Sequence, residues 1–245
     1  MINQQLTKYL ASHGPWSRRQ AEALIRAGRV TVDNQMAQLG QIVTDDNQTI
    51  QVNGRLVDKQ NEPMVYFMLN KPAGYTCTSR DFRDEHNVFE LINYPGRLFV
   101  VGRLDKDSRG LVLLTNDGEL TERLTHPRFA HAKVYEATTR PGLTGRDLPK
   151  LKDFLAKGRC LYEDQGLATA EVGQQLATDR LEIILRQGQK RQIRLLMKEA
   201  GYEVTDLKRV ALGSLKLGRL PVGACRPLTD IEIDRLFHLA QDRRA

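Results

Sequence analysis

The segment Gly102-Arg103-Leu104-Asp105 joins two apolar runs, Leu98-Phe99-Val100-Val101 before it and Leu111-Val112-Leu113-Leu114 after it. Short apolar runs separated by a polar loop that ends in Gly110 predict two strands and their connection. Asp105 then lies at a strand terminus, where a rigid scaffold can present a side chain to a ligand. An ordinary loop aspartate would look the same in isolation, so the rest of the chain has to decide between the two interpretations.

Length and composition indicate a folded protein with a polyanionic partner. The 245 residues are 40% hydrophobic, enough for one large domain or two smaller ones, and the formal charge of +7 favours a partner such as RNA. The three cysteines are far apart and the histidines include no pair at ligand spacing, so neither a disulfide framework nor a metal site is expected. With no leader-like segment and no stretch long enough to span a membrane, we expect a cytoplasmic protein without a cofactor or membrane contact.

A domain boundary is expected in the polar segment 58–63, which ends in Pro63 and precedes the strand-like run Met64-Val65-Tyr66-Phe67-Met68-Leu69. We therefore predict a small module over residues 1–57, a linker over 58–63 and a larger module over 64–245.

The small module is expected to contain two helices followed by short strands. Leu6, Tyr9 and Leu10 recur at helical spacing, and Ser17 can cap a second helix that ends at Gly28. This second helix and the residue after Gly28 supply four candidate phosphate ligands: Arg18, Arg19, Arg26 and Arg29. A merely solvated helix face is the alternative interpretation of these charges.

Three segments of this module closely resemble the S4 RNA-binding domain: Gln5-Leu6-Thr7-Lys8-Tyr9-Leu10-Ala11, Ser17-Arg18-Arg19-Gln20-Ala21-Glu22 and Ala27-Gly28-Arg29-Val30-Thr31-Val32. The sequence departs from the usual pattern at Asp33-Asn34-Gln35, where the hairpin turn commonly ends in glycine. The resemblance implies that the basic helix binds RNA.

The larger module contains four segments in a fixed order: Leu69-Asn70-Lys71-Pro72-Ala73-Gly74-Tyr75, Gly102 to Asp105, Lys133-Val134-Tyr135, and Gly188 to Arg194. In their order and spacing these segments resemble the catalytic domain of bacterial ribosomal RNA pseudouridine synthases that carry an S4 domain. A departure follows Arg194, where Leu195-Leu196-Met197 replaces the more usual basic residue and methionine. The resemblance implies an α+β fold in which a mostly antiparallel mixed sheet is flanked by helices, including segments near 147–155, 189–200 and 230–240.

The chemistry explains why a carboxylate is needed. Isomerisation of uridine breaks the N1–C1′ bond, turns the uracil, joins C5 to C1′ and removes the C5 proton. Asp105 can act as a nucleophile at the sugar or as a base that generates a glycal-like intermediate, and the sequence leaves both routes open. The resemblance implies that Arg194 is the fixed cation beside the ionised carboxylate, held by two hydrogen bonds; an exposed basic helix turn is the alternative.

The remaining candidate site residues also follow from the resemblance. It implies that Tyr135 stacks on the extruded uracil, although an aromatic residue in an alternating stretch also fits plain sheet packing. Further RNA-binding candidates are Lys71, Arg103, Lys133 and Arg191.

The resulting hypothesis is a monomeric enzyme that converts a uridine of ribosomal RNA, in 23S rather than 16S RNA, to pseudouridine using Asp105. Its partner would be ribosomal RNA or a ribosomal subunit assembly intermediate. The alternatives are a non-catalytic S4 assembly factor that binds ribosomal RNA and a synthase that acts on 16S ribosomal RNA or on transfer RNA.

Overall fold

A computed structural model describes residues 3–45, 47–57, 63–78 and 85–241 and divides the chain into two compact units, Met1–Pro63 and Met64–Ala245. Most of the expected linker, residues 58–62, lies outside the described residues. In the described part of the chain, every helix is too short or too polar to cross a membrane.

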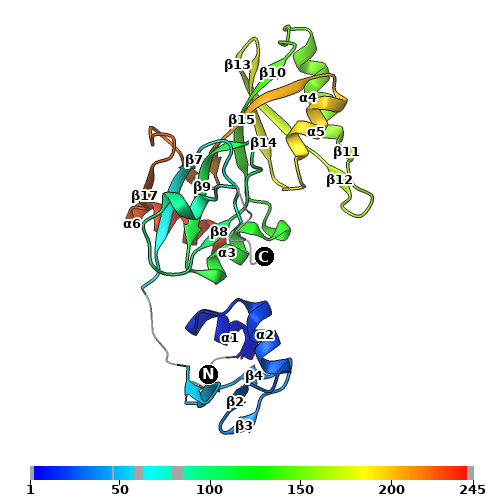
Figure 1. Ribbon diagram of the computed structural model, residues 1–245. Coiled ribbons are helices and arrows are strands. Elements are labelled where there is room, and N and C mark those ends of the chain that lie inside the picture. Colours follow the sequence, from blue (N-terminus) through cyan, green and yellow to red (C-terminus); the bar gives the residue numbers. More distant parts are fainter. Residues whose placement is uncertain (1–2, 46, 58–62, 79–84, 242–245) are drawn as a thin grey trace. The chain divides into compact units, whose positions relative to one another are not determined.

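The first unit contains two helices and two small sheets (Figure 1). Ser17 caps the second helix as expected, since its hydroxyl accepts from the Gln20 N–H and the Gln20 side chain accepts from the Ser17 N–H. Asp33 and Asn34, with φ of 51° and 64°, form the hairpin turn without glycine. The elements are β1 (Gln4–Gln5), α1 (Leu6–His13), α2 (Arg18–Arg26), β2 (Val30–Val32), β3 (Gln35–Met36), β4 (Ile42–Val43), β5 (Ile50–Val52) and β6 (Arg55–Leu56).

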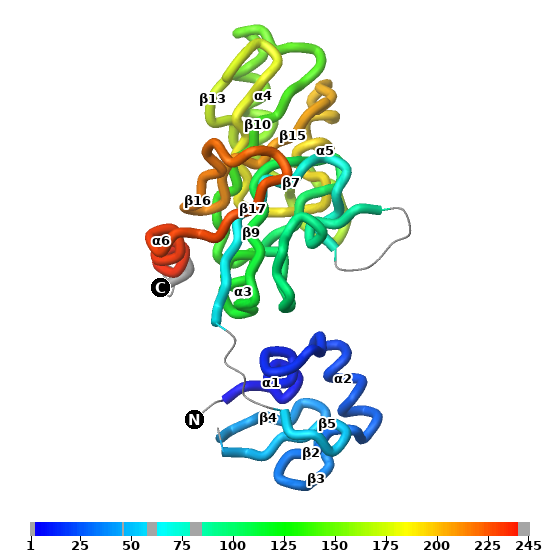
Figure 2. The backbone as a smooth tube through the Cα atoms, turned by 60° about the vertical axis from the view of Figure 1, so that its left-hand side comes forward, coloured from blue at the N-terminus to red at the C-terminus, as the bar shows by residue number. Residues whose placement is uncertain are grey.

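A mixed sheet of nine strands forms the second unit (Figure 1, Figure 2). Its main path runs β13-β14-β10-β15-β9-β7-β17, with β16 paired to β15 and β8 to β9; only β15 and β9 pair in parallel among the described strands. The strands are β7 (Tyr66–Lys71), β8 (Phe99–Val101), β9 (Arg109–Thr115), β10 (Lys133–Arg140), β13 (Glu171–Ala177), β14 (Arg180–Leu185), β15 (Glu203–Leu212), β16 (Leu215–Lys216) and β17 (Cys225–Pro227). A separate hairpin pairs β11 (Arg159–Cys160) with β12 (Leu167–Ala168).

Helices cover both faces of this sheet, which confirms the predicted α+β architecture. Alternate residues of β9 enter different cores: Leu111 packs with α3 (Gly118–Thr125) and α6 (Asp230–Gln241), and Val112 packs with α4 (Asp147–Lys157) and α5 (Gln192–Glu199). Burial on both faces explains why the sequence of β9 is apolar without alternation. Two short 3-10 helices complete the unit, η1 (Val88–Leu91) and η2 (Pro127–Phe129).

Candidate active site

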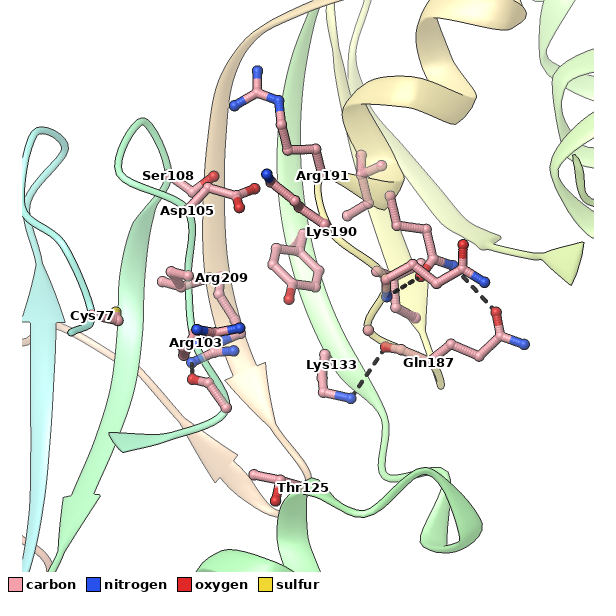
Figure 3. A pocket seen from close by; sticks show the side chains of 18 of the residues that line it. Cys77, Arg103, Asp105, Ser108, Thr125, Lys133, Gln187, Lys190, Arg191 and Arg209 are labelled. Atoms are coloured by element: carbon pink, nitrogen blue, oxygen red, sulfur yellow. Dashed lines mark hydrogen bonds between the residues drawn. The ribbon is translucent and has the colours of Figure 1, made fainter. Parts of the chain in front are cut away.

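Asp105 lies in the loop between β8 and β9, on the wall of a cleft of about 870 Å³ within the second unit. The Ser108 N–H donates to the Asp105 carbonyl oxygen at 3.0 Å, which closes a turn, and the Asp105 carboxylate points into the cleft (Figure 3). Among the described residues Asp105 is the only carboxylate that lines the cleft. Seven cationic side chains line it as well: Arg103, Lys106, Lys133, Arg186, Lys190, Arg191 and Arg209. Such a cleft attracts polyanions.

Lys71 supports the Asp105 loop from within the protein, which corrects its predicted role in RNA binding. Its side chain is fully buried, and its ammonium donates to the carbonyl oxygens of Ser108 at 2.6 Å, Pro72 at 2.9 Å and Lys106 at 3.2 Å. Burial lowers the pKa of Lys71 from its ordinary value. A buried ammonium with three backbone acceptors cannot reach a phosphate, so Lys71 orders the loop that carries Asp105 instead.

Arg209 gives the loop a second support that the sequence did not single out. It is 1% exposed and extends from β15 beneath the loop, where Nε donates to the carbonyl oxygen of Leu111 at 2.7 Å and Nη2 to that of Gly102 at 3.2 Å. Its burial follows from the pairing between β15 and β9, which local sequence does not reveal.

Arg194 does not form the predicted ion pair with Asp105. Its Nη1 donates to the Val204 carbonyl oxygen at 2.6 Å and its Nη2 to the Asp107 carbonyl oxygen at 3.2 Å, and no ion pair of Asp105 occurs among the described residues. The helix α5 begins at Gln192 rather than at Gln189, so Arg194 lies in its first turn and reaches the backbone that follows Asp105. Arg194 therefore connects α5 to the Asp105 loop.

Arg191 makes a second connection across the cleft. Its Nη1 lies 3.3 Å from Oδ2 of Asp107, and both side chains are well exposed. The residue has a φ of 55°, an uncommon conformation for a side chain other than glycine or asparagine. Arg191 is accessible from the cleft, and Asp107 already balances part of its charge.

Tyr135 and Lys133 extend the cleft along β10. Tyr135 is 7% exposed and pairs with Arg209 across the sheet, while Leu185, Ile193 and Leu207 add apolar surface to the same cleft. Lys133 donates from Nζ to the Gln187 carbonyl oxygen at 3.2 Å, and burial lowers its pKa. This combination of an apolar wall and cationic rim is suited to a planar base attached to a phosphate backbone.

Arg103 is exposed at the cleft, where Figure 3 shows it close to Arg209. The part of the chain that the structure describes contains no group of three or more His, Cys, Asp or Glu residues arranged to hold a metal ion.

The four predicted arginines of the first unit are all exposed. Arg26 pairs with Glu22 at 2.7 Å, and Arg29 donates from Nε to the Asn53 side chain at 2.6 Å. Arg18 and Arg19 lie in the first turn of α2, beside the Ser17 cap. The side chains thus form an accessible basic surface on α2 and the turn that follows it.

Comparison with known proteins agrees with this geometry. Residues 65–199 match the RNA pseudouridylate synthase family model and residues 5–50 match the S4 domain model. Ribosomal large subunit pseudouridine synthase B of Bacillus subtilis (strain 168) is 36% identical, over 97% of both chains. Dual-specificity RNA pseudouridine synthase RluF of Salmonella typhi is 35% identical, over 97% of this chain and 80% of the relative. A crystal structure of a pseudouridylate synthase is similar with a TM-score of 0.68 and 28% identity, over 96% of this chain and 100% of the other. The chain therefore belongs to the RNA pseudouridylate synthase family and carries an S4 domain at residues 5–50.

Proposed function

We propose that this protein converts one uridine of 23S ribosomal RNA to pseudouridine and that Asp105 is essential for the reaction. The observation that carries the proposal is the cleft itself, in which one carboxylate points into a lining with seven cationic side chains. The name of the Bacillus subtilis relative, which spans almost the same length, supports the large ribosomal subunit as the source of the substrate.

The residues of the cleft and the residues that support it have different roles in the proposed reaction. Asp105 reacts at C1′ of the target nucleotide or removes a proton from its sugar, so that the N1–C1′ bond breaks. C5 then joins C1′, the C5 proton is released to water, and N1 takes up a proton. Tyr135 stacks on the freed uracil, and Arg194 positions the Asp105 loop through the Asp107 carbonyl oxygen. Arg103, Lys133 and Arg191 contact the RNA at the cleft.

The S4 domain supplies affinity rather than chemistry in this proposal. Arg18, Arg19, Arg26 and Arg29 bind phosphates, and the protein acts as a monomer on ribosomal RNA or on an assembling subunit. Arg19→Ala should weaken binding and reduce the slope of log affinity against log salt by about 0.7 to 0.9, while the rate on saturating RNA stays unchanged. Loss of turnover on saturating RNA would contradict this division.

The test uses unmodified 16S and 23S ribosomal RNA incubated with the wild-type protein and with Asp105→Asn. Pseudouridine is mapped by carbodiimide labelling and primer extension. One new stop on 23S RNA with the wild type alone supports the proposal, and a stop with both proteins refutes the role of Asp105. A stop on 16S RNA alone would move the substrate to the small subunit. Transfer RNA is included as a third substrate because a synthase that acts on transfer RNA is one of the alternatives, and absence of product on all three RNAs favours the binding-only alternative.

A further inference from the structure

Lys190 is a cation of the cleft with no hydrogen bond or ion pair from its ammonium to the described residues. It lies in the loop between β14 and α5 and is exposed. Three other cations of the cleft are already paired with carboxylates: Lys106 with Glu85 at 2.9 Å, Arg186 with Glu171 at 3.2 Å and Arg191 with Asp107 at 3.3 Å. Lys190 therefore keeps a full, unpaired charge for a ligand.

The backbone around Lys190 is held in place from behind. The Tyr162 hydroxyl donates to the Lys190 carbonyl oxygen at 2.9 Å, and Nε2 of Gln189 donates to the carbonyl oxygens of Gln165 at 2.9 Å and Gly166 at 3.3 Å. The hairpin of β11 and β12 thus supports the loop. A supported backbone limits the region that the Lys190 ammonium can reach.

Lys190 extends toward Asp105 from the opposite wall of the cleft, whereas Arg191 extends in another direction (Figure 3). The positive φ of Arg191 turns the backbone at this point, so the side chains of Lys190 and Arg191 extend in different directions. Although their side chains extend toward each other, Lys190 and Asp105 form no ion pair among the described residues. The two groups face a common space from opposite sides.

A nucleotide that reacts at Asp105 must bring its ribose into this space. The phosphates on either side of the target are bound to that same ribose, so one of them must lie within a sugar's length of the carboxylate. An ammonium can bind such a phosphate from several directions because it is a compact charge with three donors and no fixed plane. We propose that Lys190 binds a backbone phosphate of the target nucleotide and thereby sets the position of the ribose against Asp105. This inference rests on the proposed function.

The first experiment compares Lys190→Gln with the wild type by tritium release from 23S ribosomal RNA labelled with [5-³H]uridine. At about 100 mM salt we expect kcat/KM to fall about tenfold and the magnitude of its salt slope to fall by about 0.7, because one single-strand phosphate contact is lost. Lys190→Arg should keep most of the activity. Lys198→Gln is the matched control, since Lys198 is exposed near the end of α5 and does not line the cleft.

The second experiment removes the phosphate charge instead of the lysine. A target RNA with a neutral methylphosphonate at the phosphate 5′ or 3′ to the uridine should react about tenfold more slowly with the wild type at one of the two positions. At that position Lys190→Gln should lose nothing further. The inference is overturned if the methylphosphonate lowers the rate of both proteins by the same factor at both positions. It is also overturned if kcat/KM of Lys190→Gln has the same salt slope as that of the wild type. If the wild type makes no product on any RNA, the proposed function itself fails. If the wild type is active and Lys190→Gln has the same kcat/KM, only the Lys190 contact is refuted.

Discussion

Replacing Lys71 by methionine tests whether buried hydrogen bonds order the Asp105 loop. The substitution keeps most of the side-chain length and removes the ammonium, so the carbonyl oxygens of Ser108 and Pro72 lose its hydrogen bonds. The Lys106 carbonyl oxygen also accepts from the Gly74 N–H at 2.8 Å and keeps that partner.

Each buried acceptor left unsatisfied lowers the free energy of unfolding by about 1 to 3 kcal/mol. Removing the buried charge offsets part of this loss, because burial of the ammonium is itself unfavourable. We therefore expect Lys71→Met to lower the free energy of unfolding by about 3 kcal/mol. For a unit of this size the loss corresponds to a decrease in Tm of roughly 6 to 12 °C. The rate on saturating RNA should also fall, because small displacements of a reacting group reduce rates strongly.

The assays are denaturant unfolding and single-turnover tritium release, both with the full chain. Lys106→Met is the control for stability, since the Lys106 ammonium makes a partly exposed ion pair with Glu85 worth about 0 to 1 kcal/mol. A Lys71→Met protein with unchanged unfolding and unchanged saturating rate would refute the reasoning. Weaker binding with a smaller salt slope and no change in stability would return Lys71 to the surface contact that the sequence indicated.

Three further predictions follow from other contacts. Arg226 lowers the pKa of Glu232 from 4.5 to about 2, so the stability from this pair is complete above pH 4.5 and is lost as the pH falls toward 2. Because solvent screens this partly exposed pair, Glu232→Gln should reduce the difference in unfolding free energy between pH 7 and pH 3 by about 1 to 2 kcal/mol, measured by denaturant unfolding at both pH values. Gly110→Ala places a Cβ 2.3 Å from the Arg209 carbonyl oxygen at a φ of 106°, so soluble yield and Tm should fall sharply, whereas Gly118→Ala, whose Cβ meets nothing nearer than 3.7 Å, should fold normally. Arg209→Met removes two buried hydrogen bonds and should lower the unfolding free energy by about 2 to 4 kcal/mol, and an unchanged denaturant midpoint would contradict this.

The sequence predicted the elements whose signals are local. Ser17 caps its helix through its own hydroxyl. The apolar runs around Asp105 form β8 and β9, since a short, continuous apolar run between turn residues is typical of a buried strand. The mixed sheet came from the family resemblance, since its parallel pairing of β15 and β9 joins segments about a hundred residues apart. Pairing between segments so far apart leaves no pattern in the local sequence.

The candidate site was predictable in its chemistry and less so in its contacts. Asp105 and Tyr135 both line the cleft as expected, although their roles remain predictions. Lys71 was misassigned because sequence does not show whether a lysine beside proline points inward, and its burial depends on three carbonyl oxygens from two loops. Arg194 reaches carbonyl oxygens rather than Asp105 because the first turn of α5 lies beside the backbone of residue 107.

The support of the Asp105 loop by Arg209 has a consequence for protein synthesis. A ribosome translates Asp105 long before it translates Arg209, and β15 must then pair with β9 before the guanidinium can reach the carbonyl oxygens of Gly102 and Leu111. Until that strand has left the exit tunnel, the nascent chain has a complete S4 domain, but its Asp105 loop lacks the hydrogen bonds from Arg209. On the proposed division of roles, a growing chain can bind RNA before it can modify it, and a chain that ends upstream of β15 would bind RNA without modifying it.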